Sequence, residues 1–169
     1  MPVDPVGAHE DERFIVSMEG LALDVPPAWE ARISRSGING NDTGTSYPVA
    51  HAATIPLPPQ RGDYGSNVVE RLQAEDVFVS LIEFGPEAVD TPLFPRISEL
   101  PRSIEPAEFH PRQLQRVLPG QAGKQVFFTF EDRAFCLYVV LGSYARRAAL
   151  TARLEDLLKG LVITPRRSQ

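Results

Sequence analysis

Few side chains in this sequence have the reactivity that catalysis or metal binding requires. They are three histidines, His9, His51 and His110, and a single cysteine, Cys136. Neither His51 nor His110 has a second histidine, a cysteine or a carboxylate at the helical i, i+4 spacing or at CxxC-type spacing, and His9 lies in an acidic tail, so a zinc site has no local signature. Cys136 lies in an apolar run, which favours a buried, unreactive thiol over a nucleophile. With no GxSxG motif either, we expect no catalytic residue, no metal ligand and no cofactor.

Two glycine-rich stretches could bring the backbone close to a ligand. The first, residues 36–46, reads SGINGNDTGTS. It contains the GxxG pattern of RNA-binding modules without their basic residues, and a calcium loop here would place Ala50 where glutamate is needed. We therefore interpret it as a hairpin turn. The second, residues 120–124 (GQAGK), could approach a phosphate or a partner's backbone, or could simply guide the chain sharply into the next strand.

Binding to another protein would use a different set of side chains. The candidate partner-binding residues are Leu93, Phe94, Phe109, Arg146 and Arg147. The three apolar residues stand among prolines, where they can act as binding anchors or cap the core of a sheet. The two arginines belong to residues 140–169, which hold six basic and two acidic residues. That region could receive an anionic partner or form a solvated helix face and tail.

Composition and charge limit the class of partner. The chain has 169 residues, a formal net charge of -5 and a pI near 5.2, which argues against nucleic-acid binding by bulk electrostatics. A single cysteine cannot form an intramolecular disulfide and fits a reducing compartment. Residues 1–12 are polar and acidic, unlike a signal peptide, and no apolar run approaches the ~20 residues of a membrane span. We therefore expect a cytoplasmic protein without membrane insertion.

Apolar and polar residues alternate along much of the first half, which predicts β-strands. The predicted strands span residues 14–18, 21–25, 29–34, 48–57 and 77–84. The last of these is an almost continuous apolar run, typical of a strand buried on both faces. Asp63 or Ser66 can cap a short helix that ends near Leu72.

Prolines interrupt the middle of the chain. Seven of them fall within residues 85–120, and they exclude any long regular element there. Apolar residues are interspersed among them, so we expect residues 86–119 to form a packed, irregular excursion, with at most a short strand over residues 113–118. Irregular segments of this length in a compact domain are often functional.

The C-terminal third predicts a hairpin followed by a helix. Residues 124–131 alternate in polarity, and after a turn residues 134–142 place apolar side chains on both faces of a second strand. Leucines at positions 150, 154, 157, 158 and 161 fall at helical spacing, which predicts a helix over about residues 144–160. All elements together predict an α+β fold: a single antiparallel β-sheet with flanking helices, the long C-terminal helix packed on it. This single domain would span residues 13–165, between a disordered tail over residues 1–12 and a short tail over residues 166–169.

The order of the predicted elements resembles a known fold. The stretch "LALDVPPAW", the glycine-rich hairpin and the final helix running into "LVITP" resemble the PsbP-like fold over residues 13–165. That fold is shared by a photosystem II extrinsic subunit and by many bacterial lipoproteins, whose lipobox cysteine this chain lacks. The stretch "LPGQAGKQVFFTFEDRAFCLYVVLGS" also looks like small uncharacterised actinobacterial proteins. The resemblance implies an accessory, non-catalytic binding module.

Two functional hypotheses follow from the sequence. The first is a non-catalytic accessory domain that binds another protein through the proline-rich segment and the basic face of the last helix. The alternative is a small-ligand-binding protein or an enzyme, with a pocket between the sheet and the proline-rich segment, around His51, His110 and Tyr138. A closed pocket with convergent polar groups would favour the alternative.

Overall fold

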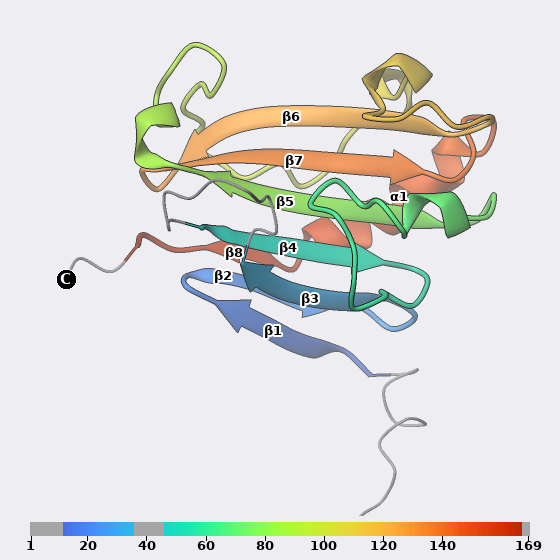
Figure 1. Ribbon diagram of the computed structural model, residues 1–169, viewed down its shortest axis with the longest axis horizontal. Coiled ribbons are helices and arrows are strands. Elements are labelled where there is room, and N and C mark those ends of the chain that lie inside the picture. The colour runs from blue at the N-terminus through green and yellow to red at the C-terminus, as the bar shows by residue number, and fades with distance from the viewer. Residues whose placement is uncertain (1–11, 36–45, 167–169) are drawn as a thin grey trace, which may run out of the picture.

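The computed structural model describes residues 12–35 and 46–166, which form two antiparallel β-sheets and one α-helix. The strand order is β1-β2-β8 in a three-stranded sheet and β3-β4-β5-β7-β6 in a five-stranded sheet (Figure 1). The predicted tails over residues 1–12 and 166–169 and the predicted turn over residues 36–46 lie almost entirely outside the described residues.

The three-stranded sheet joins the two ends of the described chain. β1 (Phe14–Met18) and β2 (Leu21–Val25) form a hairpin, and β8 (Leu161–Ile163) pairs with the other edge of β2. Alternate residues of β2 are buried, as the polarity pattern predicts. Two prolines follow β2 and cannot donate backbone hydrogen bonds, so the chain leaves this sheet for the next one.

The five-stranded sheet is covered on both faces. Its strands are β3 (Glu30–Arg35), β4 (Pro48–Ala53), β5 (Val77–Phe84), β6 (Ala122–Phe130) and β7 (Arg133–Leu141). β5 and β7 lie at its centre, and almost every residue of both strands is buried. The prediction that residues 77–84 form a strand buried on both faces is therefore confirmed.

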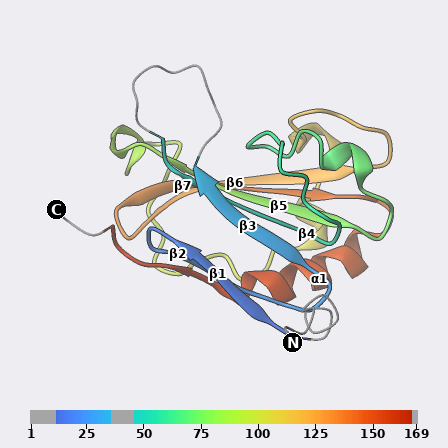
Figure 2. The same ribbon diagram turned by 60° about the horizontal axis from the view of Figure 1, so that its bottom comes forward.

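The two faces have different covers. On one face, α1 (Arg147–Leu158) and the three-stranded sheet pack against the five-stranded sheet, and Leu137 of β7 shares a core with Leu154 of α1 (Figure 2). On the other face, Tyr138 and its neighbours pack against irregular chain that includes residues 54–72. No helix in the described part of the chain has the length and apolar character needed to cross a bilayer.

The predicted fold class, a single antiparallel sheet with flanking helices, is wrong. The described residues are mostly β, in two sheets of three and five strands with one helix. β8 explains the difference: Leu161 continues the helical leucine stripe in the sequence, yet the chain leaves the helix before it and pairs with β2. Because that pairing joins opposite ends of the chain, no local pattern reveals it.

The bounds of other elements agree with the sequence to different degrees. β1, β2 and β5 have the predicted bounds, whereas the C-terminal helix spans Arg147–Leu158 and not residues 144–160. The short helix expected before Leu72 is a single 3₁₀ turn, Val69–Arg71. No strand forms over residues 113–118, which the structure describes throughout.

The proline-rich residues 86–119 form a packed excursion, as predicted. Its 3₁₀ turns among the described residues are Pro86–Ala88, Pro106–Glu108 and Pro111–Gln113. Each begins with proline, whose fixed φ suits the first helical position and whose missing N–H is not needed there. Its buried apolar side chains are Phe94, Leu100, Ile104, Phe109 and Leu114. The excursion therefore contributes these side chains to the core.

A buried ion pair fastens the C-terminal end of the described chain to the five-stranded sheet. Arg133 Nη2 and Nε lie 2.7 and 3.0 Å from the two carboxylate oxygens of Glu83, and these side chains are 2% and 3% exposed. Arg133 also donates to the carbonyl oxygen of Thr164, and Arg166 Nη2 lies 2.6 Å from Glu83 Oε1. The chain after β8 is thereby held against β5 and β7.

Candidate ligand-binding site

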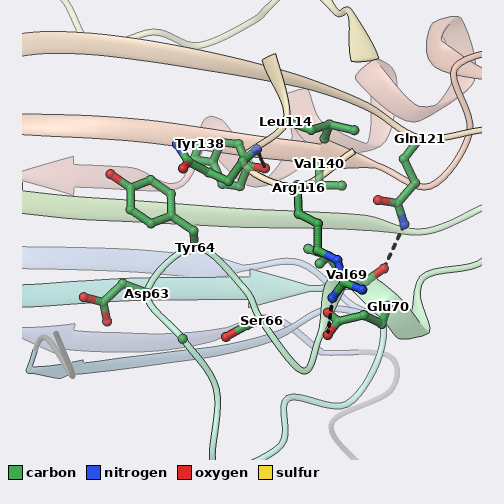
Figure 3. Close-up of a pocket in the computed structure, with 12 residues that line it drawn as sticks. Asp63, Tyr64, Ser66, Val69, Glu70, Leu114, Arg116, Gln121, Tyr138 and Val140 are labelled. Carbon is green, nitrogen blue, oxygen red and sulfur yellow. Dashed lines mark hydrogen bonds and ion pairs between the residues drawn. The ribbon is translucent and has the colours of Figure 1, made fainter. Parts of the chain in front are cut away.

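A cavity of about 240 Å³ lies between the five-stranded sheet and the irregular chain that covers it (Figure 3). Its floor is formed by Tyr138 and Val140 of β7, and its walls come from residues 62–70 and 114–121. We call this cavity the Tyr138 pocket. It lies where the end of the proline-rich excursion meets the turns that follow β4, and one of the two functional hypotheses expects a pocket between the sheet and that excursion.

Two glycines let the walls approach the sheet. Gly65 has a φ of +87°, and a Cβ built on it would lie 2.5 Å from Cε2 of Phe78. Gly123 of β6 lies under Leu114, whose Cδ2 would be 2.7 Å from a Cβ at that position. Any larger side chain at either position would push a wall outward. These glycines therefore let residues 62–70 and Leu114 pack closely against the sheet.

Two tyrosines shape the floor and one wall. The Tyr138 hydroxyl oxygen accepts a hydrogen bond of 2.8 Å from the backbone N–H of Gln115, and the Tyr64 ring packs edge-on against the Tyr138 ring at 5.4 Å. Burial raises the pKa of Tyr138 and raises that of Tyr64 to about 12. Both hydroxyls are therefore neutral at physiological pH, and the Tyr138 hydroxyl, which accepts from Gln115, can still donate a hydrogen bond to a ligand.

Gln121 supplies a hydrogen-bond acceptor without a partner. Its Nε2 donates to the carbonyl oxygen of Val69 at 2.8 Å, which fixes the orientation of the amide because only the nitrogen can donate. Its Oε1 is buried and accepts no hydrogen bond from any described residue. Figure 3 shows this oxygen turned toward the space between Gln121 and Arg116. A buried carbonyl oxygen left unpaired costs about 1–3 kcal/mol, so this wall favours a donor inside the pocket.

Charged side chains stand at the rim. Arg116 Nη1 lies 3.7 Å from Glu70 Oε2, and both side chains line the pocket (Figure 3). Glu70 is held in place because its carboxylate also accepts from the backbone N–H of Asn67. Arg116 is largely exposed, and an ion pair this long in contact with water contributes little to stability. The Arg116 side chain can therefore move aside to admit a ligand.

His51 lies behind a wall of the pocket and does not line it. Its Nδ1 accepts a 2.8 Å hydrogen bond from Nε of Arg61, so the ring hydrogen is on Nε2, 2.9 Å from the carbonyl oxygen of Asp63. The Ser80 hydroxyl donates to the same carbonyl oxygen at 2.6 Å. Burial lowers the pKa of His51 to about 4, with a further contribution from the charge of Arg61. A neutral His51 thus anchors the wall that carries Tyr64.

The structure separates the candidate partner-binding residues, which are Leu93, Phe94, Phe109, Arg146 and Arg147. Leu93 is 58% exposed, whereas Phe94 and Phe109 are buried among other core side chains. Arg146 is exposed, and the guanidinium of Arg147 stacks on a tyrosine ring at 4.3 Å. The segment with Leu93 follows β5 and the arginines follow β7, so the two groups lie at opposite ends of the sheet (Figure 1).

The remaining side chains with possible chemistry have structural positions. Cys136 is fully buried, and burial raises the pKa of its thiol to about 12, which confirms the prediction of a buried thiol. His110 accepts from the backbone N–H of Arg112 at the start of a 3₁₀ turn, while His9 lies outside the described residues. Within the described ranges, no three His, Cys, Asp or Glu side chains are grouped as a metal site would need.

The stretch of residues 120–124 leads into β6, which begins at Ala122. Its lysine, Lys124, pairs with Glu108 at 3.6 Å and does not line the pocket. Gln121 is the residue of this stretch that the sequence did not single out, although the glycines around it indicated an unusual backbone. Tyr64 carries no comparable signal in the sequence.

Comparison with known proteins assigns neither a family nor a ligand to this site. No protein-family model, curated protein or solved structure matches the chain. The resemblance to the PsbP-like fold therefore stays a prediction.

Proposed function

We propose that this protein binds a small, neutral organic molecule in the Tyr138 pocket, without catalysing a reaction on it. The observation that carries this proposal is Gln121 Oε1, a buried acceptor with no partner in the described chain, at the wall of a cavity. A ligand with one N–H or O–H group would satisfy this oxygen. The proposal develops the pocket hypothesis that the sequence suggests for the region between the sheet and the proline-rich segment.

The size and lining of the pocket suggest a ligand of about one ring. Its volume of about 240 Å³ exceeds the ~150 Å³ of a cavity that holds benzene, and it lies below the ~300 Å³ at which drug-sized pockets begin. Val69, Leu114 and Val140 offer apolar contacts, while Gln121 and Tyr138 offer an acceptor and a donor. An aromatic or aliphatic ring that carries an amide or hydroxyl group has matching chemistry.

The surroundings of the pocket favour binding over catalysis. Cys136 has a thiol pKa raised to about 12, and both ring nitrogens of His51 already have hydrogen-bond partners. Neither group is therefore prepared to act as a nucleophile or a general base at neutral pH. A single cysteine also suits the reducing cytoplasm, which is where we place the protein.

The hypothesis of a protein-binding accessory domain stays a prediction. Of the apolar residues proposed for it, only Leu93 is at the surface of the described chain, because Phe94 and Phe109 are buried. A partner-binding surface on the proline-rich segment would therefore need contacts from residues other than Phe94 and Phe109. The pocket therefore has the better support.

Benzamide is a suitable probe, because it combines a ring with an amide N–H. We expect benzamide to shift the backbone NMR signals of residues 62–70 and 114–121, with a Kd on the order of a millimolar for so small a molecule. Methyl benzoate has a similar shape but no donor, so Gln121 Oε1 would stay unpaired. Its affinity should be roughly tenfold lower.

Two matched variants test the location. Val140→Met extends a side chain into the pocket and should abolish the shifts, whereas Val117→Met makes the same chemical change at a side chain that is 66% exposed. Val117→Met should bind benzamide as the wild type does. Equal binding of benzamide by both variants, or equal affinity for methyl benzoate and benzamide, would overturn the proposal.

A further inference from the structure

A second depression, of about 550 Å³, lies between the edges of the two sheets. It runs where β1 and β3 lie beside each other, and we call it the β1–β3 groove (Figure 1). Its lining comes from Val16 and Ser17 of β1, from residues 31–34 of β3, and from Pro59 and Arg61. It shares no lining residue with the Tyr138 pocket, so the two sites can be tested separately.

The lining of the β1–β3 groove is cationic. Arg32 and Arg61 contribute guanidinium groups, Ser17 and Ser34 contribute hydroxyls, and none of the described lining residues is acidic. The whole chain, in contrast, carries a formal net charge of -5. A concentration of positive charge in a depression of an acidic protein favours an anion there.

Arg61 is held in one orientation. Its Nε donates to Nδ1 of His51 at 2.8 Å and its Nη1 donates to the carbonyl oxygen of Pro58 at 2.8 Å. These contacts leave Nη2 without a hydrogen bond to the described chain. Burial lowers the pKa of Arg61, and the charge of Arg32 lowers it further, while Glu30 acts in the opposite direction. An anion would relieve the repulsion between the two guanidinium groups.

Arg32 has no compensating partner among the described residues. Its guanidinium forms no hydrogen bond or ion pair with the described residues, although it lies on the same strand as Arg35, which pairs with Glu19 at 2.8 Å. Arg32 lies opposite His51 in the β3–β4 register, and His51 in turn orients Arg61. The fold therefore places along the same groove one guanidinium that is held in place, that of Arg61, and one that is unpaired within residues 12–35 and 46–166, that of Arg32.

We propose that the β1–β3 groove binds a phosphate monoester. A monoester carries close to two negative charges at neutral pH, which matches the two guanidinium groups, whereas a carboxylate would leave one of them uncompensated. Guanidinium groups bind phosphate oxygens with short, paired hydrogen bonds, and the hydroxyls of Ser17 and Ser34 can donate to the same group.

Phenyl phosphate tests this inference in the intact protein at low ionic strength. We expect it to shift the backbone NMR signals of residues 31–34 and Arg61 in a saturable way. Arg32→Gln should weaken the affinity about tenfold, since it removes one charged donor pair. Because the Arg32 side chain is exposed and has no partner in the described chain, this variant should fold like the wild type. Arg146→Gln, at an exposed arginine outside the groove, should bind with unchanged affinity.

Acetate at matched ionic strength serves as a control that distinguishes specific binding of a phosphate monoester from a general attraction of anions to the groove. It should shift the same signals only weakly and at higher concentration. If acetate and phenyl phosphate act alike, or if Arg32→Gln binds phenyl phosphate as tightly as Arg146→Gln does, the groove attracts an adventitious ion only and the inference is wrong.

Discussion

Acid should destabilise this protein through His51. The ring is 2% exposed, and its two contacts require the neutral form with hydrogen on Nε2. Protonation of Nδ1 would replace the hydrogen-bond acceptor for Arg61 Nε by a second N–H donor. It would also bury a positive charge beside the Arg61 guanidinium. These effects, with burial as the largest, lower the pKa of His51 to about 4.

The sign and size of the effect follow from linkage. Between pH 6.5 and about 4, the unfolded chain binds a proton at His51 that the folded chain does not. The contribution of His51 to the free energy of unfolding is therefore complete above the pKa that His51 has in the unfolded chain. It is lost as the pH falls toward the lower pKa that His51 has in the folded protein. At ~1.4 kcal/mol per pH unit, the full loss is about 3 kcal/mol of the free energy of unfolding.

Urea denaturation of the wild type and of His51→Gln measures this loss. The glutamine can still donate to the carbonyl oxygen of Asp63 but does not titrate, and other groups contribute equally to both proteins. The stability advantage of the wild type should therefore shrink by about 2 kcal/mol between about pH 7 and about pH 4.5. If the difference between wild type and His51→Gln does not vary with pH, the reasoning is refuted.

Two further results are expected. Glu83→Gln should lower the free energy of unfolding by about 3 kcal/mol in urea at neutral pH, because Arg133 would keep a buried charge without its carboxylate. Cys136 in the native protein should resist alkylation by iodoacetamide for hours at mildly alkaline pH, as followed by mass spectrometry. Burial raises its pKa to about 12, and the thiolate is the form that reacts.

Each of these results has a matched control. Glu87→Gln changes an exposed carboxylate near Glu83 in the sequence and should alter stability by less than about 0.5 kcal/mol. Equal losses in the two variants would contradict the importance of the ion pair. Protein denatured in guanidinium chloride should be alkylated at Cys136 quickly. Comparable labelling of the native protein would mean that the thiol of β7 is accessible.

The local elements could be predicted because their signals are local. Turn residues and alternating polarity fix β1 and β2, and a continuous apolar run fixes β5. The division into two sheets could not be predicted, because it depends on Leu21 pairing with Ile163 at the other end of the chain. Leu161 lies at helical spacing from Leu154 and Leu157, so the sequence pattern favours a helix at a position where the structure has a strand.

The sequence suggests the location of the candidate site, but it does not identify most of the residues that line it. The sequence suggests a pocket between the sheet and the proline-rich segment, and of the residues expected around it Tyr138 lines the pocket, whereas His51 and His110 do not. Gln121 could not be identified, because its role depends on Val69, which lies 52 positions away and occupies its amide nitrogen. An acceptor becomes unpaired only through such distant contacts.

The most direct test of ligand binding in the Tyr138 pocket is a set of intermolecular nuclear Overhauser effects between benzamide and methyl groups of the protein. The pocket methyls belong to Val69, Leu114 and Val140, while Leu93 and Val117 carry exposed methyls outside it. Binding in the pocket predicts contacts from the benzamide ring to Leu114 and Val140. Contacts confined to Leu93 or Val117, or none to any methyl group at saturating benzamide, would contradict it.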